Sequence, residues 1–147
     1  YGPAYKGIPL VSSIVIAFAS LGRNVPFAFN RKEKKDHGEG GVIIGTPLKG
    51  RVLIVDDVIS AGTSVNESVN LILEEGAKPS GIAISIDREE KGTGLLSAVE
   101  EIKETHHLPV CHLTSLQEIM RYIEHHETYA SHINAMRDYQ KLYGIKA

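Results

Sequence analysis

The chain has 147 residues, of which 42% are hydrophobic and 23% are charged, a size and balance that fit one globular domain with a substantial core. Its net charge of −2 gives no electrostatic basis for binding nucleic acid or an anionic membrane, and its single cysteine excludes an internal disulfide. The longest apolar stretch, residues 8–21, is interrupted by one proline and three serines and is too short to span a bilayer. We therefore expect a soluble, cytoplasmic protein.

The first six residues, Tyr1-Gly2-Pro3-Ala4-Tyr5-Lys6, contain neither an initiator methionine nor the regions of a signal peptide. We therefore expect a further segment upstream. Apolar residues at helical spacing then predict an amphipathic helix over residues 8–21, which Gly22 ends.

A short apolar strand is predicted over residues 25–29, and it leads into a strongly charged segment. Residues 31–41 contain eight ionisable side chains, three glycines and no apolar residue, which predicts a mobile, solvated loop. Residues 42–45 resume a strand, and residues 47–50 supply a turn.

Residues 51–55 form a continuous apolar and β-branched run that predicts a strand buried on both faces of a parallel sheet. The elements after it alternate between helix and strand, and Ser115 with Glu118 three residues later predicts a capped helix. Helices are predicted over residues 65–76, 95–105, 115–123 and 129–143, and strands over residues 80–86 and 109–113. This alternation predicts an α/β fold with a central, mainly parallel sheet flanked by helices.

A turn of small residues follows the strand predicted at residues 51–55. It lies beyond the carboxyl end of that strand, which is where ligands bind in open α/β sheets. Backbone N–H groups and hydroxyls over residues 60–64 can surround a phosphate monoester at the start of a helix. No lysine follows, so this is not a triphosphate loop. Asp56 and Asp57 can accept hydrogen bonds from sugar hydroxyls or hold water around Mg²⁺, which fits a sugar phosphate. Read alone, this segment is equally compatible with a structural role, in which Asp56 or Asp57 ends the strand and Thr63 or Ser64 caps the helix.

The complete string from Val52 to Ser64 resembles the thirteen-residue phosphoribosyl pyrophosphate motif of the type I phosphoribosyltransferases. Residues 1–9, 30–41 and 86–90 resemble the members of this family that act on orotate, in the same order and at similar spacing. The resemblance implies a single phosphoribosyltransferase domain over residues 1–147, with the family's N-terminal hood segment missing or incomplete. It also implies transfer of phosphoribosyl from phosphoribosyl pyrophosphate to orotate in pyrimidine biosynthesis, giving orotidine 5′-phosphate and diphosphate.

The resemblance carries the family's functional residues onto matching positions of this chain. The donor-binding positions are Tyr5, Lys6, Arg31, Lys32, Lys35, His37, Asp56, Asp57, Val58, Ile59, Ser60, Ala61, Gly62, Thr63 and Ser64. Arg31, Lys35 and His37 are the implied catalytic residues, on a loop that closes over the departing pyrophosphate and excludes water. Ser60 and Arg88 match orotate-binding positions, and a guanidinium suits a carboxylate.

The resemblance implies further that Mg²⁺ binds through donor oxygens and water near Asp56 and Asp57, without direct protein ligands. It implies a homodimer in which the loop reaches the partner's site. Because the family's upstream segment completes the base pocket, we expect weak or absent turnover from residues 1–147 alone, with phosphate binding partly retained.

Three alternatives remain open from the residues alone. A regulator that senses phosphoribosyl pyrophosphate without catalysis would keep the phosphate turn, and a purine phosphoribosyltransferase would share the same motif. Arg88 can instead form a surface ion pair with Asp87 or Glu90.

Cys111 is expected to be a buried strand residue. Surface or packing roles are expected for His106, His107, His112, His125, His126 and His132.

Overall fold

The structure, a computed structural model, describes residues 1–35 and 41–145, with the backbone alone for residues 33–35. The chain divides into two compact units, one formed by residues 1–57 and 64–83 and the other by residues 58–63 and 84–147. The described residues include no helix with the length and apolar character needed to cross a bilayer.

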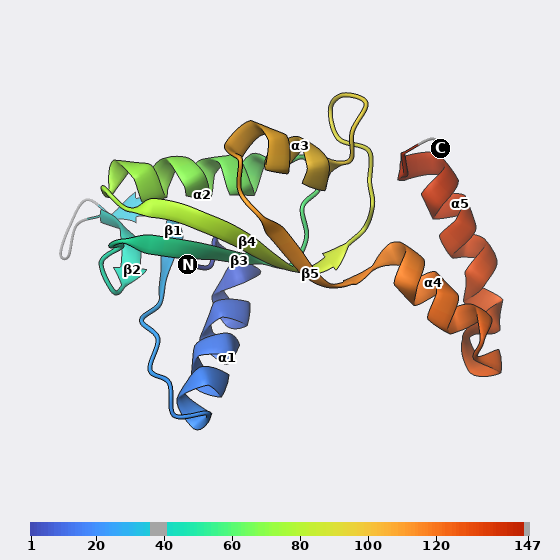
Figure 1. Ribbon diagram of the computed structural model, residues 1–147, viewed down its shortest axis with the longest axis horizontal. Helices are drawn as coiled ribbons and strands as arrows, with labels where there is room; N and C mark the ends of the chain where they lie inside the picture. Colours follow the sequence, from blue (N-terminus) through green and yellow to red (C-terminus); the bar gives the residue numbers. More distant parts are fainter. Residues whose placement is uncertain (36–40, 146–147) are drawn as a thin grey trace. The chain divides into compact units, whose positions relative to one another are not determined.

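The first unit is built around strand β3. It contains α1 (Gly7–Ser20), β1 (Ala28–Lys35), β2 (Gly41–Gly45), β3 (Arg51–Asp56), α2 (Thr63–Glu74) and the first part of β4 (Lys78–Asp87). Helices α1 and α2 lie on opposite faces of β3 (Figure 1). Ile54 of β3 and Ile72 of α2 are fully buried, and Val11 of α1 is 3% exposed, so apolar side chains from all three elements form the core.

Residues 1 and 2 lie between strands β1 and β3. Tyr1 N–H donates to the carbonyl of Leu53 and Val55 N–H donates to the carbonyl of Tyr1, both at 2.8 Å. Gly2 N–H donates to the carbonyl of Ala28 at 3.0 Å. Residues 1–2 therefore join β1 to β3 by backbone hydrogen bonds.

The second unit contains the end of β4, followed by helices and a strand in alternation. These are α3 (Ala98–His106), β5 (Val110–Ser115), α4 (Leu116–Glu124), the 3₁₀ helix η1 (Glu127–His132) and α5 (Ile133–Tyr143). Strands β3, β4 and β5 are neighbours in that order in a parallel sheet, which confirms the predicted fold class. Helices α4 and α5 run side by side (Figure 1), and Arg137 of α5 forms an ion pair with Glu124 of α4 at 2.7 Å.

Capping explains two helix starts. The predicted cap of α4 is confirmed, because Ser115 Oγ accepts from Glu118 N–H and the Glu118 carboxylate accepts from Ser115 N–H. Helix α3 begins at Ala98, three residues later than predicted, because Ser97 forms the same reciprocal pair with Glu100.

The prediction of a loop over residues 31–41 is wrong for residues 31–35, which belong to β1. This strand pairs antiparallel with β2, with Phe29 opposite Ile44 and Lys35 opposite Gly41. Pairing with β2 is found at both ends of this segment, at Asn30 opposite Ile43 and at Lys35 opposite Gly41, with an irregularity in the register between them. Residues 36–40 lie outside the described residues.

Three further predictions need correction. Strand β3 is not buried on both faces, because Leu53 is 45% exposed and Arg51 is also exposed. The helix predicted over residues 129–143 is a 3₁₀ helix as far as His132 and an α-helix from Ile133. Cys111 is exposed rather than buried, because β5 ends the strand order and residues 111–113 are exposed on both faces of the strand.

Candidate functional site

Asp56 ends β3 as a buried carboxylate held by two donors. It is 7% exposed and accepts hydrogen bonds from Asp57 N–H at 2.9 Å and from Ser64 Oγ at 3.1 Å. Burial raises the pKa of Asp56, and the neighbouring charge of Asp57 raises it further. The carboxylate is therefore fixed in place against the first turn of α2, in an environment that would gain from a nearby cation or hydroxyl donor.

The segment between Asp57 and α2 contains a buried apolar residue, Ile59, among exposed small residues. Ile59 is 4% exposed and fixes the turn, whereas Ser60 and Thr63 are exposed. Gly62 has a φ of 72°, which a residue with a side chain adopts only with strain. The first turn of α2, residues 63–66, contains no acidic residue, so the positive end of the helix is open to an anion.

The turn that carries Tyr5 and Lys6 packs onto the end of β3. A Cβ at Gly7 would lie 2.6 Å from the carbonyl oxygen of Val55, the residue before Asp56. Such a contact is far shorter than real Cβ contacts, so glycine is required for this close approach. Both Tyr5 and Lys6 are exposed, and they therefore lie near the buried acid while remaining accessible.

Strand β1 is attached to the same turn. The side-chain oxygen of Asn30 accepts from Ala4 N–H at 2.8 Å, and the ammonium group of Lys32 lies 4.8 Å from the centre of the Tyr5 ring. These contacts bring Tyr5 and Lys32, two predicted donor-binding residues, together. Arg31 lies between Asn30 and Lys32 on the same strand and is half-buried.

Arg88 lies just past β4 in the second unit. Its Nη2 donates to Glu90 Oε2 at 3.0 Å, so the ion pair considered from the sequence is present. Arg88 Nε is buried and has no hydrogen-bond partner among the described residues. A guanidinium has five N–H donors, and the pair with Glu90 therefore leaves donors for a ligand.

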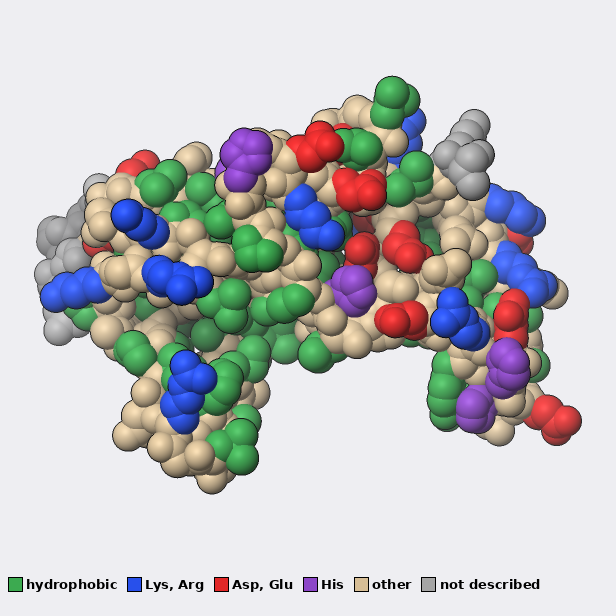
Figure 2. Space-filling view, in the orientation of Figure 1, with side chains coloured by type: hydrophobic (Ala, Val, Ile, Leu, Met, Phe, Trp, Pro, Cys, Tyr) green, Lys and Arg blue, Asp and Glu red, His purple; other side chains and the backbone are tan. Residues whose placement is uncertain are grey.

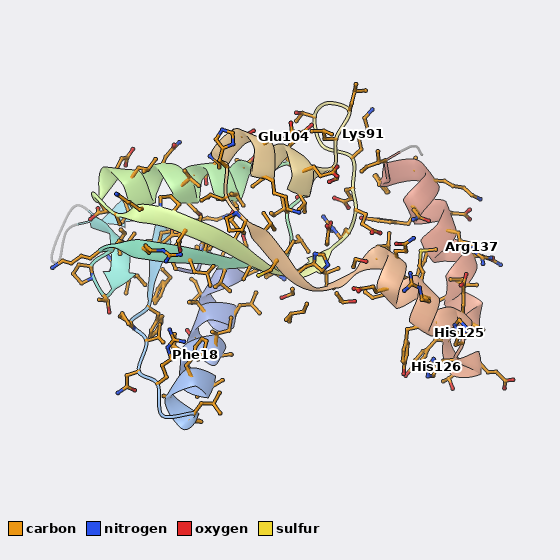
Figure 3. All side chains as sticks on the ribbon, viewed as in Figure 1. Phe18, Lys91, Glu104, His125, His126 and Arg137 are labelled. Atoms are coloured by element: carbon orange, nitrogen blue, oxygen red, sulfur yellow. The ribbon has the colours of Figure 1, made fainter. Side chains whose placement is uncertain are left out.

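The structure thus brings together part of the predicted set. Tyr5, Lys6, Arg31, Lys32, Asp56, Asp57 and Ser64 belong to the first unit, and residues 58–63 and Arg88 belong to the second. For Lys35 only the backbone at the end of β1 is described, and His37 lies outside the described residues. The histidines expected at the surface include His125 and His126, labelled in Figure 3, whose rings bond backbone carbonyls at the exposed end of α4.

Two contacts at these sites were not predicted. Asn30 directly precedes the charged segment, and no sequence pattern marks its hydrogen bond with Ala4, 26 residues earlier in the chain. The hydroxyl of Tyr139 donates to Glu90, 49 residues away, and no sequence pattern marks that pair.

An apolar cavity of about 390 Å³ lies elsewhere in the first unit. It is lined by α1, β3 and residues 46–49, and its lining includes none of the predicted site residues. Beside it, hydrophobic side chains gather along α1 (Figure 2), where Ile16 is 67% exposed.

Comparisons with known proteins agree with the geometry. A family model for the phosphoribosyl transferase domain matches residues 1–95. The chain is 55% identical over 145 residues to the orotate phosphoribosyltransferase of Chromobacterium violaceum, covering 99% of this chain and 68% of that protein. It is 53% identical over 146 residues to that of Neisseria meningitidis, with the same two shares.

Among solved structures, the orotate phosphoribosyltransferase of Francisella tularensis superposes with a TM-score of 0.76 at 37% identity, over 97% of this chain and 66% of that one. The chain thus spans about two thirds of the length of these relatives. The same base-specific name recurs among them, which favours the orotate-type resemblance over the purine and regulatory alternatives. The chain belongs to the orotate phosphoribosyltransferase family, within the type I phosphoribosyltransferases.

Proposed function

We propose that this chain binds phosphoribosyl pyrophosphate and orotate and transfers the phosphoribosyl group between them, giving orotidine 5′-phosphate and diphosphate. The observation that carries the proposal is the junction of β3 and α2, where the buried Asp56 is followed by an exposed small-residue turn. An acid pair beside an anion-binding turn matches a molecule with ribose hydroxyls and a phosphate monoester.

In this proposal the turn binds the 5′-phosphate of the donor. The hydroxyls of Ser60, Thr63 and Ser64 and the backbone N–H groups of residues 58–64 supply the donors. Val58, Ile59, Ala61 and Gly62 contribute through the backbone, since small or inward-facing side chains let the phosphate approach. Asp56 and Asp57 accept hydrogen bonds from the ribose hydroxyls.

The cations of the first unit bind the pyrophosphate group. Lys6 and Lys32 flank Tyr5, and Arg31, Lys35 and His37 complete the set proposed from the family resemblance. The leaving group bears several negative charges, so nearby cations stabilise the transition state more than the ground state. The family resemblance implies a loop that covers the pyrophosphate and excludes water that would hydrolyse the donor.

The acid pair also fits Mg²⁺. Two adjacent carboxylates present the hard oxygen donors that this ion prefers, and because burial raises the pKa of Asp56, a nearby cation would favour its charged form. Asp56 and Asp57 would hold the ion through its water shell beside the donor. When bound, Mg²⁺ supplies charge neutralisation at the pyrophosphate.

Arg88 and Ser60 bind orotate in this proposal. The planar guanidinium of Arg88 presents parallel N–H donors that match the carboxylate of the base. The residues then act by orientation: the ribose is held through its hydroxyls and phosphate while the base attacks the anomeric carbon. Positive character builds on the sugar as diphosphate leaves, and no covalent nucleophile is assigned.

We also propose that residues 1–147 act as one phosphoribosyltransferase domain within a homodimer. Exposed apolar residues on α1 and at its C-terminal end, among them Ile16 and Leu21 at 67% and 81%, supply a surface that a second copy would cover. A cytoplasmic location is consistent with a single cysteine.

The function is tested by the fall in orotate ultraviolet absorbance on mixing the full-length protein with phosphoribosyl pyrophosphate and Mg²⁺. Orotate loss is expected with the wild type and should vanish in Asp57→Asn, while Asp138→Asn, an exposed aspartate on α5, serves as the matched control. Tight donor binding without orotate loss would support the regulatory alternative, and consumption of adenine instead would support the purine enzyme.

A further inference from the structure

Arg88 is one end of a chain of three hydrogen-bonded side chains within the second unit. Its Nη2 donates to one carboxylate oxygen of Glu90 at 3.0 Å, and the hydroxyl of Tyr139 donates to the other. Glu90 is 14% exposed. Both of its oxygens are thus engaged, one by the loop after β4 and one by helix α5.

The same loop is attached to the end of α5 by the backbone. Lys91 N–H donates to the carbonyl of Tyr143 at 2.8 Å, and Glu90 forms an isolated antiparallel bridge with Gly144. Figure 3 labels Lys91 on this loop and Arg137 further back along α5. The rings of Tyr139 and Tyr143 pack with their centres 4.8 Å apart. Helix α5 therefore approaches Glu90 in a fixed position.

This arrangement determines how freely Arg88 can turn. The terminal torsion of a glutamate is broad, so a carboxylate held at one oxygen alone can rotate. Tyr139 removes that freedom, and the fixed carboxylate then fixes the guanidinium plane. Recognition of a carboxylate by two parallel N–H groups requires such a fixed plane. The bond to Glu90 also raises the pKa of Tyr139, which keeps its hydroxyl protonated as a donor.

We propose that Tyr139 is a positioning residue for base recognition: acting through Glu90, it holds Arg88 in the orientation that binds the carboxylate of orotate. Helix α5 thereby contributes to substrate binding without touching the substrate. The inference rests on the proposed function, in which Arg88 binds the base.

The test compares Tyr139→Phe with wild type in the full-length enzyme. We expect the KM for orotate to rise about tenfold, the effect of losing one hydrogen bond to a charged group. The KM for phosphoribosyl pyrophosphate and the melting temperature should stay near wild type, which a loss of general stability would not allow. Tyr143→Phe is the matched control, because it removes a hydroxyl from the same helix and ring pair and leaves the Glu90 bond in place.

A double-mutant cycle with Arg88→Gln tests whether Tyr139 acts on orotate binding through Arg88 or independently of it. If Tyr139 acts through Arg88, adding Tyr139→Phe to Arg88→Gln should not raise the orotate KM further. A full additional effect would overturn the positioning role. An orotate KM that rises in Arg88→Gln but not in Tyr139→Phe overturns this inference alone. An orotate KM unchanged in Arg88→Gln removes Arg88 from the proposed base site and overturns the inference with it.

Discussion

At the scale of single residues, Asp56 combines burial with charge. Its carboxylate is 7% exposed, and although Asp57 N–H and Ser64 Oγ donate to it, burial raises its pKa. Two donors thus do not offset the loss of solvation. A buried acid with a raised pKa at the end of a strand is typical of a ligand-binding site. There a bound ligand replaces the solvation that the carboxylate lost on folding.

Asp56→Asn should therefore stabilise the fold at neutral pH. A carboxyl group with a raised folded pKa stabilises most below its ordinary value of about 4, and this contribution is lost as pH rises through the folded value. We expect the free energy of unfolding at pH 7.5 to increase by about 1 kcal/mol, with a smaller gain at pH 4.5, measured by urea titration.

Two further measurements complete that prediction. Asp138→Asn, an exposed aspartate paired with Lys141 at 3.3 Å, should change stability little at either pH. Donor binding should weaken in Asp56→Asn despite the greater stability. A loss of stability at pH 7.5 would mean that the two hydrogen bonds to the charged form outweigh its burial.

The acids and the phosphate turn could be predicted because they occupy one continuous stretch of sequence. Local order sets their chemistry: a strand end, two carboxylates, small residues and a helix start. The pair of Tyr139 and Glu90 could not be predicted, since 49 residues separate them and only the fold brings them together. Asn30 was missed for the same reason.

At the scale of elements, β1 shows where composition misleads. Charge and glycine content predicted a loop, yet residues 31–35 continue β1, which pairs with β2 at Asn30 and again at Lys35 across an irregularity in the register. An exposed hairpin does not need apolar residues along its whole length. Backbone hydrogen bonds hold its strands together, and Phe29 opposite Ile44 supplies a local apolar contact. The helices were predicted better, because their caps and periodicity are local.

Helix α4 allows a test of how much its N-terminal cap contributes to the stability of the fold. The carboxylate of Glu89 accepts from Gln117 N–H at 3.0 Å, so the first turn of α4 is attached to the residue after Arg88. Ser115→Ala removes the cap and should lower the free energy of unfolding by about 1 kcal/mol, measured by urea titration. Ser131→Ala, at an exposed position of η1, is the control and should change little. Equal stability of both variants would contradict a role for the cap.

At the scale of the whole molecule, α1 carries apolar side chains around much of its circumference, and the described residues leave several of them uncovered. Ile14, Ile16 and Leu21 are 36%, 67% and 81% exposed, and Leu53 of β3 is 45% exposed beside the apolar cavity. Soluble proteins rarely leave several large apolar side chains around one helix open, because burying them would be favourable. A second copy of the chain is the occupant that the proposed homodimer provides.

Ile16→Lys should therefore weaken self-association, because a charge in a buried apolar contact loses its solvation. Sedimentation velocity of the full-length protein at micromolar concentration is expected to show a dimer for the wild type and a shift toward monomer for this variant. Leu95→Lys is the matched control, since Leu95 is 89% exposed in the loop before α3 and belongs to the second unit rather than to α1. If Ile16→Lys remains dimeric but melts at a lower temperature, α1 is covered within one subunit, and the dimer must form through another surface.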